Sequence, residues 1–417
     1  MQIENRDLVI IGGGPAGLAA AISAYDNGVK DILVIEREGK TGGVLKQCIH
    51  NGFGLTRFGE NLTGPEYAYK FIEQVEARNI QVLTDTFVLD LTNDKIITYT
   101  NTNGIKQVKA KAVVLAMGCR ERSKGALNIA GTRPAGIFSA GTAQKYVNVN
   151  GVLPGKRVVI LGSGDIGLIM ARRMTLEGAK VLCVSEIMPY SSGLKRNIEQ
   201  CLNDFDIPLY LSHTIVEIEG KDRVTGVVIA KVDQDKKAIP GTEMHFDCDT
   251  VLFSVGLISE NELSLRAKVP LSNRTKGAVV DNYRETEVDG IFACGNALHV
   301  HDLVDFVSEE AETAGKAVAK YILEGKKQKQ YIECQAGDMV AYVLPQKMDT
   351  LTEKPEKVYF RVRGTMKNCY VKIDTGDTQR KIKKLSVAPG EMESVTLSVD
   401  QLKKAKYINV SIERGDN

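Results

Sequence analysis

The cysteines of this chain lack the spacing of a metal site or of a redox pair. The sequence has eight cysteines, and they are scattered rather than grouped as C-x-x-C or C-x-x-x-x-C. This absence argues against a disulfide framework and against a zinc or iron–sulfur site, because such sites draw on closely spaced thiols. We therefore expect no bound metal and a reducing, cytoplasmic setting.

Charge and hydropathy exclude two further classes of protein. The 54 Lys and Arg nearly balance the 52 Asp and Glu, so the net charge of +2 indicates neither nucleic acid nor an anionic membrane surface as a partner. The apolar stretch at residues 8–25 is broken by Gly-Gly-Gly-Pro, so no transmembrane segment is expected. The N-terminus leads straight into that stretch, so no signal peptide is expected either. A length of 417 residues predicts two or three domains.

One glycine-rich pattern occurs twice in the chain. Each copy follows a short apolar run, reads G-x-G-x-x-G, and is followed about 20 residues later by a glutamate. The copies are Gly12-Gly13-Gly14-Pro15-Ala16-Gly17 with Glu36, and Gly162-Ser163-Gly164-Asp165-Ile166-Gly167 with Glu186. One such pattern is weak evidence, but two in register, each with its own strand, helix and acidic residue, predict two dinucleotide sites.

The physical role of each residue supports this prediction. The first glycine allows a tight turn, the second lets a pyrophosphate approach the backbone, and the third lets the helix pack on the strand. The helix N-terminus offers N–H groups and partial positive charge to the phosphates. The glutamate accepts hydrogen bonds from a ribose, and residues 187–190 contain no base, so we expect Glu186 to favour NADH over NADPH. The alternative for each copy is a glycine-rich turn without a ligand.

Apolar runs and chain breakers predict an α/β chain with a different C-terminal part. Helices are expected at residues 65–78, 165–177 and 303–323, and buried strands at residues 8–11, 33–35, 107–117, 158–161, 181–185, 251–256 and 290–296. Residues 324–330 read as a polar, basic linker. Beyond it, strands at residues 358–363, 369–373, 393–399 and 408–412 predict a small antiparallel β module. That module is either a solvated cap or a docking surface.

This layout resembles that of the flavoproteins with two dinucleotide-binding domains, the pyridine nucleotide–disulfide oxidoreductase superfamily. The resemblance covers about residues 5–325. It implies an α/β fold of two Rossmann-like FAD/NAD(P)-binding domains, the second inserted in the first, followed by the small C-terminal antiparallel β domain. The expected domains are an FAD domain at 1–118 and 281–325, an NAD(H) domain at 119–280, and a β module at 331–417.

A second FAD-contacting segment carries the resemblance further. In that family the segment reads T-x-x-x-x-[IV]-[FY]-A-x-G-D, and residues 286–296 match it except that Asn296 replaces the aspartate. Asparagine keeps a carbonyl acceptor, so FAD binding is expected to survive. The resemblance implies further cofactor contacts from Arg37, Gly43, Gly118, Gly295 and His299.

The redox cysteine pair of the family's disulfide reductases is missing here. Only Cys48 follows Gly42-Gly43, and thiol–disulfide exchange needs two sulfurs, so a disulfide reductase is disfavoured. By the resemblance, Cys48 and His50 fall where the family's redox helix faces the flavin. Both are catalytic candidates, Cys48 as a thiolate of lowered pKa and His50 as its orienting group. A packed, inert thiol and a structural histidine are the alternatives.

His301 is the third catalytic candidate. The resemblance directs the N-terminus of the helix from about residue 303 toward the flavin, where the helix dipole would stabilise the reduced flavin. A positive charge on His301 would add to this effect. The alternative is a helix cap formed by Asp302 with a buried histidine beside it.

The resemblance is more specific in two segments, residues 42–54 and 294–305, which indicate one group within the superfamily. They are similar to the FAD subunits that accompany anaerobic glycerol-3-phosphate dehydrogenase, opine oxidase and hydroxyproline dehydrogenase. This implies an NADH oxidoreductase subunit with FAD, in an oligomeric assembly, that exchanges electrons with a partner flavoprotein dehydrogenase; any iron–sulfur subunit is another chain. The alternatives are a stand-alone NADH oxidase or diaphorase, an amine or opine dehydrogenase subunit, and a non-enzymatic scaffold. If the β module docks a partner, removing residues 331–417 should abolish assembly and leave NADH-to-dye activity.

Overall fold

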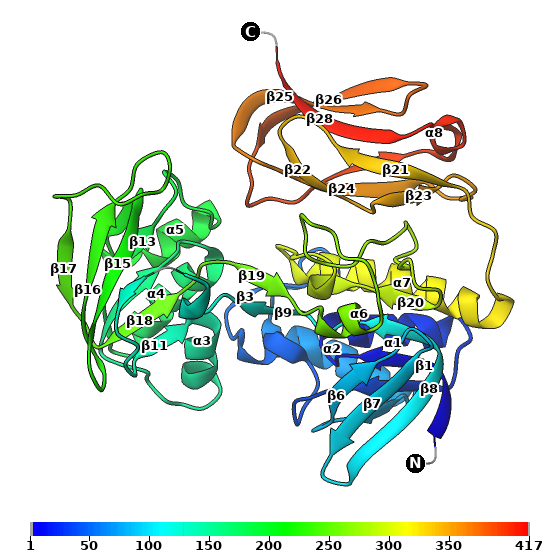
Figure 1. Ribbon diagram of the computed structural model, residues 1–417, viewed down its shortest axis with the longest axis horizontal. Coiled ribbons are helices and arrows are strands. Elements are labelled where there is room, and N and C mark those ends of the chain that lie inside the picture. The colour runs from blue at the N-terminus through cyan, green and yellow to red at the C-terminus, as the bar shows by residue number, and fades with distance from the viewer. Residues whose placement is uncertain (1–2, 128, 416–417) are drawn as a thin grey trace. The chain divides into compact units, whose positions relative to one another are not determined.

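Short runs of Val, Ile and Leu form buried parallel strands at the centre of two structural units (Figure 1). The computed structural model describes residues 3–127 and 129–415. One unit comprises Met1–Cys119 with Ser259–Asn417, and the other comprises Arg120–Ile258. The chain crosses between the units at β9 (Cys119–Glu121) and β19 (Leu257–Ser259). The described helices include none with the length and apolarity that a membrane span requires.

The first unit is built on a sheet with the strand order β5-β2-β1-β8-β7-β6, and β20 also pairs with β8. Strands β5, β2, β1, β8 and β20 pair in parallel, as expected for a nucleotide-binding half, whereas β7 is antiparallel to both β8 and β6. The bounds are β1 (Ile3–Ile11), β2 (Ile32–Ile35), β5 (Gln81–Leu83), β6 (Phe87–Leu91), β7 (Ile96–Asn101), β8 (Gly104–Leu115) and β20 (Ile291–Ala293).

Alternation along β1 divides the core of this unit into two layers. Leu8 and Ile10 pack on the helix side, with α1 (Pro15–Asp26), α2 (Gly64–Ala77) and α7 (Val304–Glu324). Val9 and Ile11 pack on the other side of the sheet. The capping box between Thr63 and Glu66 explains where α2 begins, because each side chain satisfies a backbone N–H of the first turn. Shorter elements of this part are β3 (Asn51–Phe53), β4 (Leu62–Thr63) and α6 (Glu262–Arg266).

The second unit repeats the same plan. Its five parallel strands have the order β11-β18-β12-β13-β14, and a four-stranded sheet, β10-β15-β16-β17, packs beside them. The parallel strands are β11 (Ile137–Ser139), β12 (Arg157–Leu161), β13 (Lys180–Glu186), β14 (Leu209–Leu211) and β18 (Thr250–Phe253). The others are β10 (Ala130–Gly131), β15 (His213–Gly220), β16 (Val224–Lys231) and β17 (Met244–Asp247), with helices α3 (Ala140–Asn148), α4 (Asp165–Leu176) and α5 (Lys195–Cys201).

The C-terminal part is a β module with two sheets and its own apolar core, drawn in orange and red in Figure 1. One sheet has the order β23-β21-β28-β25-β26 and the other β22-β24-β27. Their bounds are β21 (Tyr331–Ala336), β22 (Val340–Leu344), β23 (Lys347–Asp349), β24 (Glu356–Val362), β25 (Met366–Asp374), β26 (Gln379–Val387), β27 (Glu393–Leu397) and β28 (Ile408–Arg414). The pairing of β21 with β28 is parallel, within an otherwise antiparallel arrangement.

One local prediction in this region needs correction. The strand expected to run to residue 399 ends at Leu397, because Ser398 and Gln401 form a capping box that starts α8 (Val399–Lys404). Residues 325–330, in the predicted polar, basic linker, form neither helix nor strand, and Lys329 near their end makes a largely buried ion pair. Lys329 Nζ lies 2.6 Å from Asp281 Oδ2 and 2.5 Å from Glu285 Oε2. These two ion pairs fix this part of the chain to the first unit.

Residues 259–280 belong with the first unit, although the sequence suggested a boundary near 280. The buried residues Ala267, Val269 and Ala278 pack in the same apolar cluster as Val9 and Leu344. Leu344 comes from β22 and is fully buried there. Its burial ties the C-terminal module to the first sheet through an apolar contact.

Candidate dinucleotide sites and a buried histidine cluster

The three glycines of the first fingerprint meet different neighbours. A Cβ on Gly12, whose φ is +109°, would lie 2.3 Å from the carbonyl oxygen of Ala116, and one on Gly17 would lie 1.8 Å from that of Gly12. A Cβ on Gly14 would meet only the Cα of Gly43, at 3.7 Å. The first and third glycines therefore serve the packing of strand and helix, and the second leaves open space.

That open space lies at the N-terminus of α1. Gly14 is its extended N-cap residue, and no side chain caps the first turn, so its N–H groups remain for a ligand. Gly43 borders Gly14 closely, since a Cβ on Gly43 would lie 3.0 Å from the Cα of Gly14. Gly295 packs on Ala16 in the same way, with a would-be Cβ contact of 2.7 Å. These bare backbones around a helix N-terminus fit the pyrophosphate of a dinucleotide.

Glu36 stands at the end of β2, where the sequence places a ribose ligand. Its carboxylate is 6% exposed and accepts hydrogen bonds from the N–H groups of Gly13 (2.7 Å) and Glu38 (2.8 Å). These bonds fix its orientation and leave lone pairs for hydroxyl donors. Arg37 is exposed beside it, and Gly118, with a φ of +75°, follows the end of β8 with open space around it.

The second fingerprint has the same division of roles. A Cβ on Gly162 would lie 2.1 Å from Ser254 O, and one on Gly167 would lie 2.6 Å from Gly162 O. A Cβ on Gly164 would meet nothing closer than the hydroxyl of Ser254, at 3.6 Å. The N-cap residue of α4, Gly164, has no capping side chain, and Ser254 Oγ accepts the Gly167 N–H at 3.0 Å, so the N–H groups of Asp165 and Ile166 are the ones that fit a dinucleotide.

Glu186 occupies the place in the second site that Glu36 has in the first. It accepts hydrogen bonds from the N–H and the hydroxyl of Ser163, at 2.9 and 2.7 Å, and from the N–H of Met188 at 2.9 Å. The side chain of Asp165 accepts bonds from Leu194 N–H (2.8 Å) and Asn197 Nδ2 (2.7 Å), so the predicted contact of Asp165 with the cofactor would come from its backbone at the start of α4. Asp165 thus holds the loop before α5, and Ile166 packs in the apolar cluster around α4.

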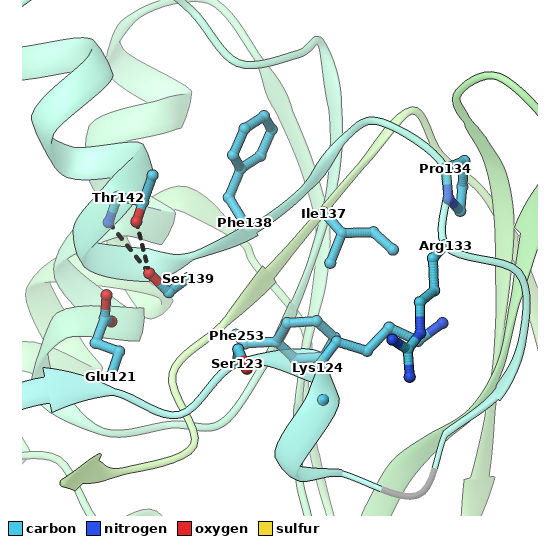
Figure 2. A pocket seen from close by; sticks show the side chains of 11 residues that line it. Glu121, Ser123, Lys124, Arg133, Pro134, Ile137, Phe138, Ser139, Thr142 and Phe253 are labelled. Carbon is cyan, nitrogen blue, oxygen red and sulfur yellow. Dashed lines mark hydrogen bonds between the residues drawn. The ribbon is translucent and has the colours of Figure 1, made fainter.

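A pocket of about 410 Å³ lies within the second unit (Figure 2). Ser139 and Phe253, which line it, are the last residues of β11 and β18, and ligands of parallel sheets lie outside such carboxyl ends. Lys124 and Arg133 add positive charge to the lining. Burial and the nearby Arg133 lower the pKa of Lys124. Glu121, which also lines the pocket, accepts the N–H of Gly141 at the start of α3 at 2.9 and 2.8 Å.

Cys48 and His50 follow a short 3₁₀ helix, η1 (Gly43–Gln47). The Cys48 Sγ lies 3.4 Å from the carbonyl oxygen of Val44, and burial raises the pKa of the thiol to about 12. This shift argues against the thiolate considered from the sequence and favours the alternative of a packed thiol. His50 is partly buried, with Nδ1 3.1 Å from Asn51 O and its ring 5.0 Å from that of Phe53. None of the eight cysteines, all of which are described, forms a disulfide.

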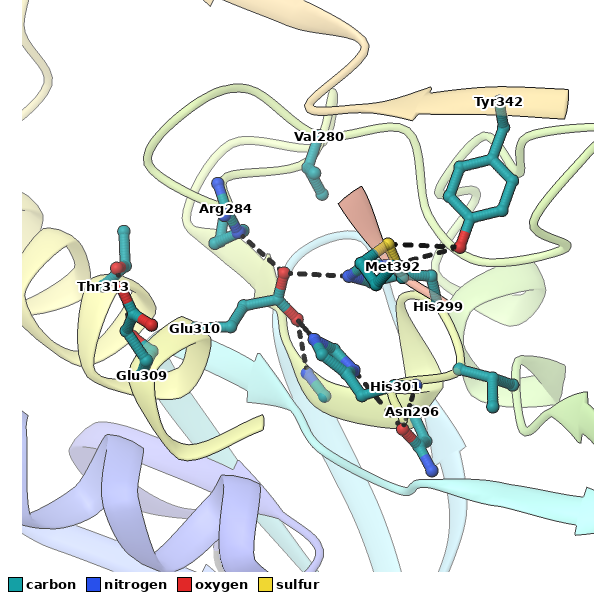
Figure 3. Close-up of polar contacts among 12 residues, drawn as sticks. Val280, Arg284, Asn296, His299, His301, Glu309, Glu310, Thr313, Tyr342 and Met392 are labelled. Carbon is teal, nitrogen blue, oxygen red and sulfur yellow. Dashed lines mark hydrogen bonds and ion pairs between the residues drawn. The ribbon is translucent and has the colours of Figure 1, made fainter. Parts of the chain in front are cut away.

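His299 and His301 meet at one buried carboxylate that the sequence reasoning missed, that of Glu310 on α7 (Figure 3). The Nε2 atoms of His299 and His301 lie 3.2 and 3.4 Å from its two oxygens. Arg284 Nε donates to it at 3.1 Å and the Gly295 N–H at 2.9 Å. The signal in the sequence was a glutamate on the apolar face of a long helix, where an acid requires partners.

The charges within this cluster compensate one another. Burial alone would raise the pKa of Glu310, but His299, His301 and Arg284 together hold it below its ordinary value. Burial, with the neighbouring His299, lowers the pKa of His301 to about 3. This shift argues against the positive charge expected of His301, and Arg284 supplies the cation instead.

The ligand atoms of His299, His301 and Glu310 lie within 4.8 Å of one another, a spacing that a metal ion could use. However, Arg284 and the Gly295 N–H already donate to the two carboxylate oxygens, and a guanidinium beside the carboxylate repels a second cation. Asn296 completes the cluster, because its Oδ1 accepts the His301 N–H at 3.1 Å. The arrangement is therefore a satisfied hydrogen-bond network, and it includes Gly295 and Asn296 of the segment expected to contact FAD.

Comparison with known proteins identifies the family of the chain. The sequence model of the pyridine nucleotide-disulphide oxidoreductase family matches residues 6–321. The chain is 27% identical to a thioredoxin reductase of Mycolicibacterium smegmatis, covering 74% of this chain and 92% of the relative. It is 23% identical to one of the subunits of opine oxidase from Agrobacterium tumefaciens, covering 75% and 64%, and 27% identical to an NADH dehydrogenase of Bacillus subtilis, covering 70% and 54%. The chain thus spans only about half of that NADH dehydrogenase.

The fold is also known from solved structures. A thioredoxin reductase of T. acidophilum superposes with a TM-score of 0.63 at 23% identity, covering 76% of this chain and 98% of that one. Its match confirms the predicted fold of two Rossmann-like parts.

Proposed function

The chain belongs to the pyridine nucleotide-disulphide oxidoreductase family and is an FAD-dependent NAD(P)H oxidoreductase, and from this we propose that it is the NADH-handling subunit of a dehydrogenase assembly. In this proposal its partner is a flavoprotein dehydrogenase of the kind that acts on glycerol 3-phosphate. Any iron–sulfur centre of the assembly belongs to another chain, because the cysteines of this one lack cluster spacing.

Each cofactor is assigned to one fingerprint. The N-terminus of α1, Glu36 and the Gly295–Asn296 segment hold FAD, and the N-terminus of α4 with Glu186 holds the nicotinamide dinucleotide. When bound, the two cofactors supply the exchange of a hydride between nicotinamide and flavin. The protein orients them through backbone N–H groups and two carboxylates, all of which are held in place before binding.

The environment of Glu186 is the observation that supports a preference for NADH over NADPH. Its carboxylate is held by Ser163 and Met188, and residues 187–190 contain no base that could pair with a 2′-phosphate. A fixed carboxylate accepts bonds from ribose hydroxyls and repels a phosphate at that position. We therefore infer a preference for NADH.

The properties of Cys48 indicate that the flavin does not exchange electrons with a disulfide. Its thiol has a raised pKa, and no second cysteine lies near it in the sequence to resolve an adduct. Among the relatives, the opine oxidase chain is named as a subunit, and the glutamate synthase protein of Escherichia coli is named as a small chain. These two features favour a partner protein as acceptor or donor.

The test is to mix the flavin-loaded protein with NADH, and separately with NADPH, in the absence of oxygen. We expect NADH to bleach the visible absorbance of the flavin rapidly and NADPH to do so slowly. Bleaching by neither, or faster bleaching by NADPH, would contradict the proposal.

A stand-alone NADH dehydrogenase is the second candidate, favoured by the relative of that name in Bacillus subtilis. The two functions differ in what reoxidises the flavin. Fast turnover of the isolated chain with oxygen or a quinone favours the stand-alone enzyme. Slow turnover that a co-purifying flavoprotein accelerates favours the role in an assembly.

A further inference from the structure

The loop at residues 299–302 lies between the second FAD-contacting segment and the C-terminal module. Every residue of this loop has a polar contact that fixes it. On one side, His299 and His301 contact Glu310 of α7, and His301 also contacts Asn296. From the module come contacts to His299, Val300 and Asp302.

Arg361 of β24 makes most of the contacts from the module. Its guanidinium donates to Val300 O at 3.1 Å, to Tyr342 Oη at 3.2 Å and to Pro389 O at 3.1 Å, and it pairs with the Asp302 carboxylate. The Arg361 side chain is 15% exposed. Only a planar group with several fixed N–H donors can bond these four partners at once, and a lysine cannot.

Tyr342 of β22 extends this contact toward the cofactor site. Its hydroxyl accepts from Arg361 and lies 3.4 Å from His299 Nδ1. Figure 3 shows Tyr342 and Met392 of the module facing His299. From His299 the chain of contacts continues to Glu310 at 3.2 Å and from Glu310 to the Gly295 N–H at 2.9 Å.

Gly295 is the residue that packs directly on Ala16 at the start of α1. The network therefore runs without a gap from a residue of the C-terminal module to the glycines that border the FAD position. Such networks of hydrogen-bonded groups are one physical route for energetic coupling between distant residues, and measuring the effect of a substitution in the network tests whether they couple.

We propose that Arg361 is a positioning residue of the FAD site, and that the C-terminal module sets the conformation of residues 295–302 through it. The inference rests on the assignment of FAD to the first fingerprint. It gives the module a role in the flavin environment, beyond that of a solvated cap or a docking surface.

The test compares three variants with the wild type after loading with FAD. Arg361→Met keeps the length of the side chain and removes its donors, and Arg361→Lys keeps only the charge. Arg363→Met is the matched control, because Arg363 is exposed and donates to Val340 O within the module. The measurements are the FAD dissociation constant, the visible spectrum and midpoint potential of the bound flavin, and the thermal midpoint of the apoprotein.

We expect Arg361→Met to weaken FAD binding about tenfold and to shift the flavin spectrum and potential, with Arg361→Lys in between. Arg363→Met should resemble the wild type. A purely structural role would lower the thermal midpoint and leave the spectrum and potential of the retained flavin unchanged, and that result would overturn the inference. Equal behaviour of Arg361→Met and Arg363→Met would overturn it as well.

Two further results keep the test decisive. If Arg361→Met does not fold, Tyr342→Phe removes only the hydroxyl between Arg361 and His299, and it should shift the spectrum and potential of the bound flavin away from the wild-type values. An unchanged spectrum in Tyr342→Phe would then overturn the inference. A wild-type protein that holds no FAD would instead overturn the cofactor assignment of the first fingerprint, on which the inference rests.

Discussion

At the scale of single residues, glycines in equivalent positions of one motif have separable roles. A Cβ on Gly164 would make only ordinary contacts, with Ser254 Oγ at 3.6 Å and Ser192 Oγ at 3.7 Å, whereas a Cβ on Gly167 would lie 2.6 Å from Gly162 O and 2.8 Å from the Cβ of Ser254. The same contrast holds between Gly14 and Gly17. The motif therefore combines two glycines that packing requires with one that tolerates a Cβ, and the predicted ligand would contact this last position.

This contrast predicts opposite effects for two alanine substitutions. Gly164→Ala should leave the thermal midpoint unchanged and raise the KM for NADH, because its methyl group intrudes only where the pyrophosphate approaches. Gly167→Ala should destabilise the second unit by about 2 kcal/mol or more, because strand and helix must move apart. Thermal unfolding and steady-state kinetics separate the two effects. An unchanged KM in Gly164→Ala would place the dinucleotide elsewhere.

Cys48 provides a second prediction at this scale. With the pKa of its thiol raised to about 12, the group stays protonated throughout the neutral range, and thiolate chemistry requires deprotonation. Cys48→Ser should therefore keep NADH-to-dye activity within about twofold of the wild type, with a superimposable pH profile from about pH 6 to 9. A large loss of activity, or the loss of an ionisation from the profile, would restore Cys48 to the catalytic residues.

At the scale of elements, α7 carries two adjacent glutamates in different environments. Glu310 is buried against Arg284 and two histidines, whereas Glu309 is exposed and pairs with the exposed Lys357. Removing one partner of a buried pair leaves an uncompensated charge, but exposed pairs contribute little.

Glu310→Gln should therefore destabilise the first unit by about 3 kcal/mol, because the guanidinium of Arg284 loses its buried counterion. Glu309→Gln is the matched control on the same helix and should cost less than about 1 kcal/mol. Chemical denaturation of the two variants measures the difference. Equal stabilities would mean that water or another group already compensates Arg284.

The elements that the sequence predicted well are those whose signals are local. Glycine spacing, apolar runs and a glutamate about 20 residues later indicate the strand, turn and helix of each fingerprint, and both are present in the structure. The cluster around Glu310 could not be predicted, because Arg284, His299 and Glu310 come from separate segments that only tertiary packing brings together. The ion pair of Lys329 could not be predicted for the same reason, because its partner Asp281 is far away in the sequence.

At the scale of the whole molecule, the C-terminal module is part of the first unit. Leu344 of β22 lies in the apolar cluster beneath the first sheet, the Tyr331 hydroxyl donates to Asp281 at 2.8 Å, and Arg361 pairs with Asp302. These contacts are apolar, polar and ionic, and they are distributed along the module. They argue against the separable docking module considered from the sequence.

Removal of residues 331–417 should therefore harm the first unit itself, because it exposes the apolar cluster around Leu344 and leaves Asp302 without its cation. We expect the truncated chain to lose FAD or to aggregate rather than to keep NADH-to-dye activity. Leu344→Ala is a milder version of the same change and should cost about 2–5 kcal/mol through the cavity that it leaves. Leu385→Ala, at a side chain that is 81% exposed on β26, is its control and should change stability by less than about 0.5 kcal/mol. A truncated chain that is stable, yellow and active would show instead that the module can be separated and that its contacts serve assembly.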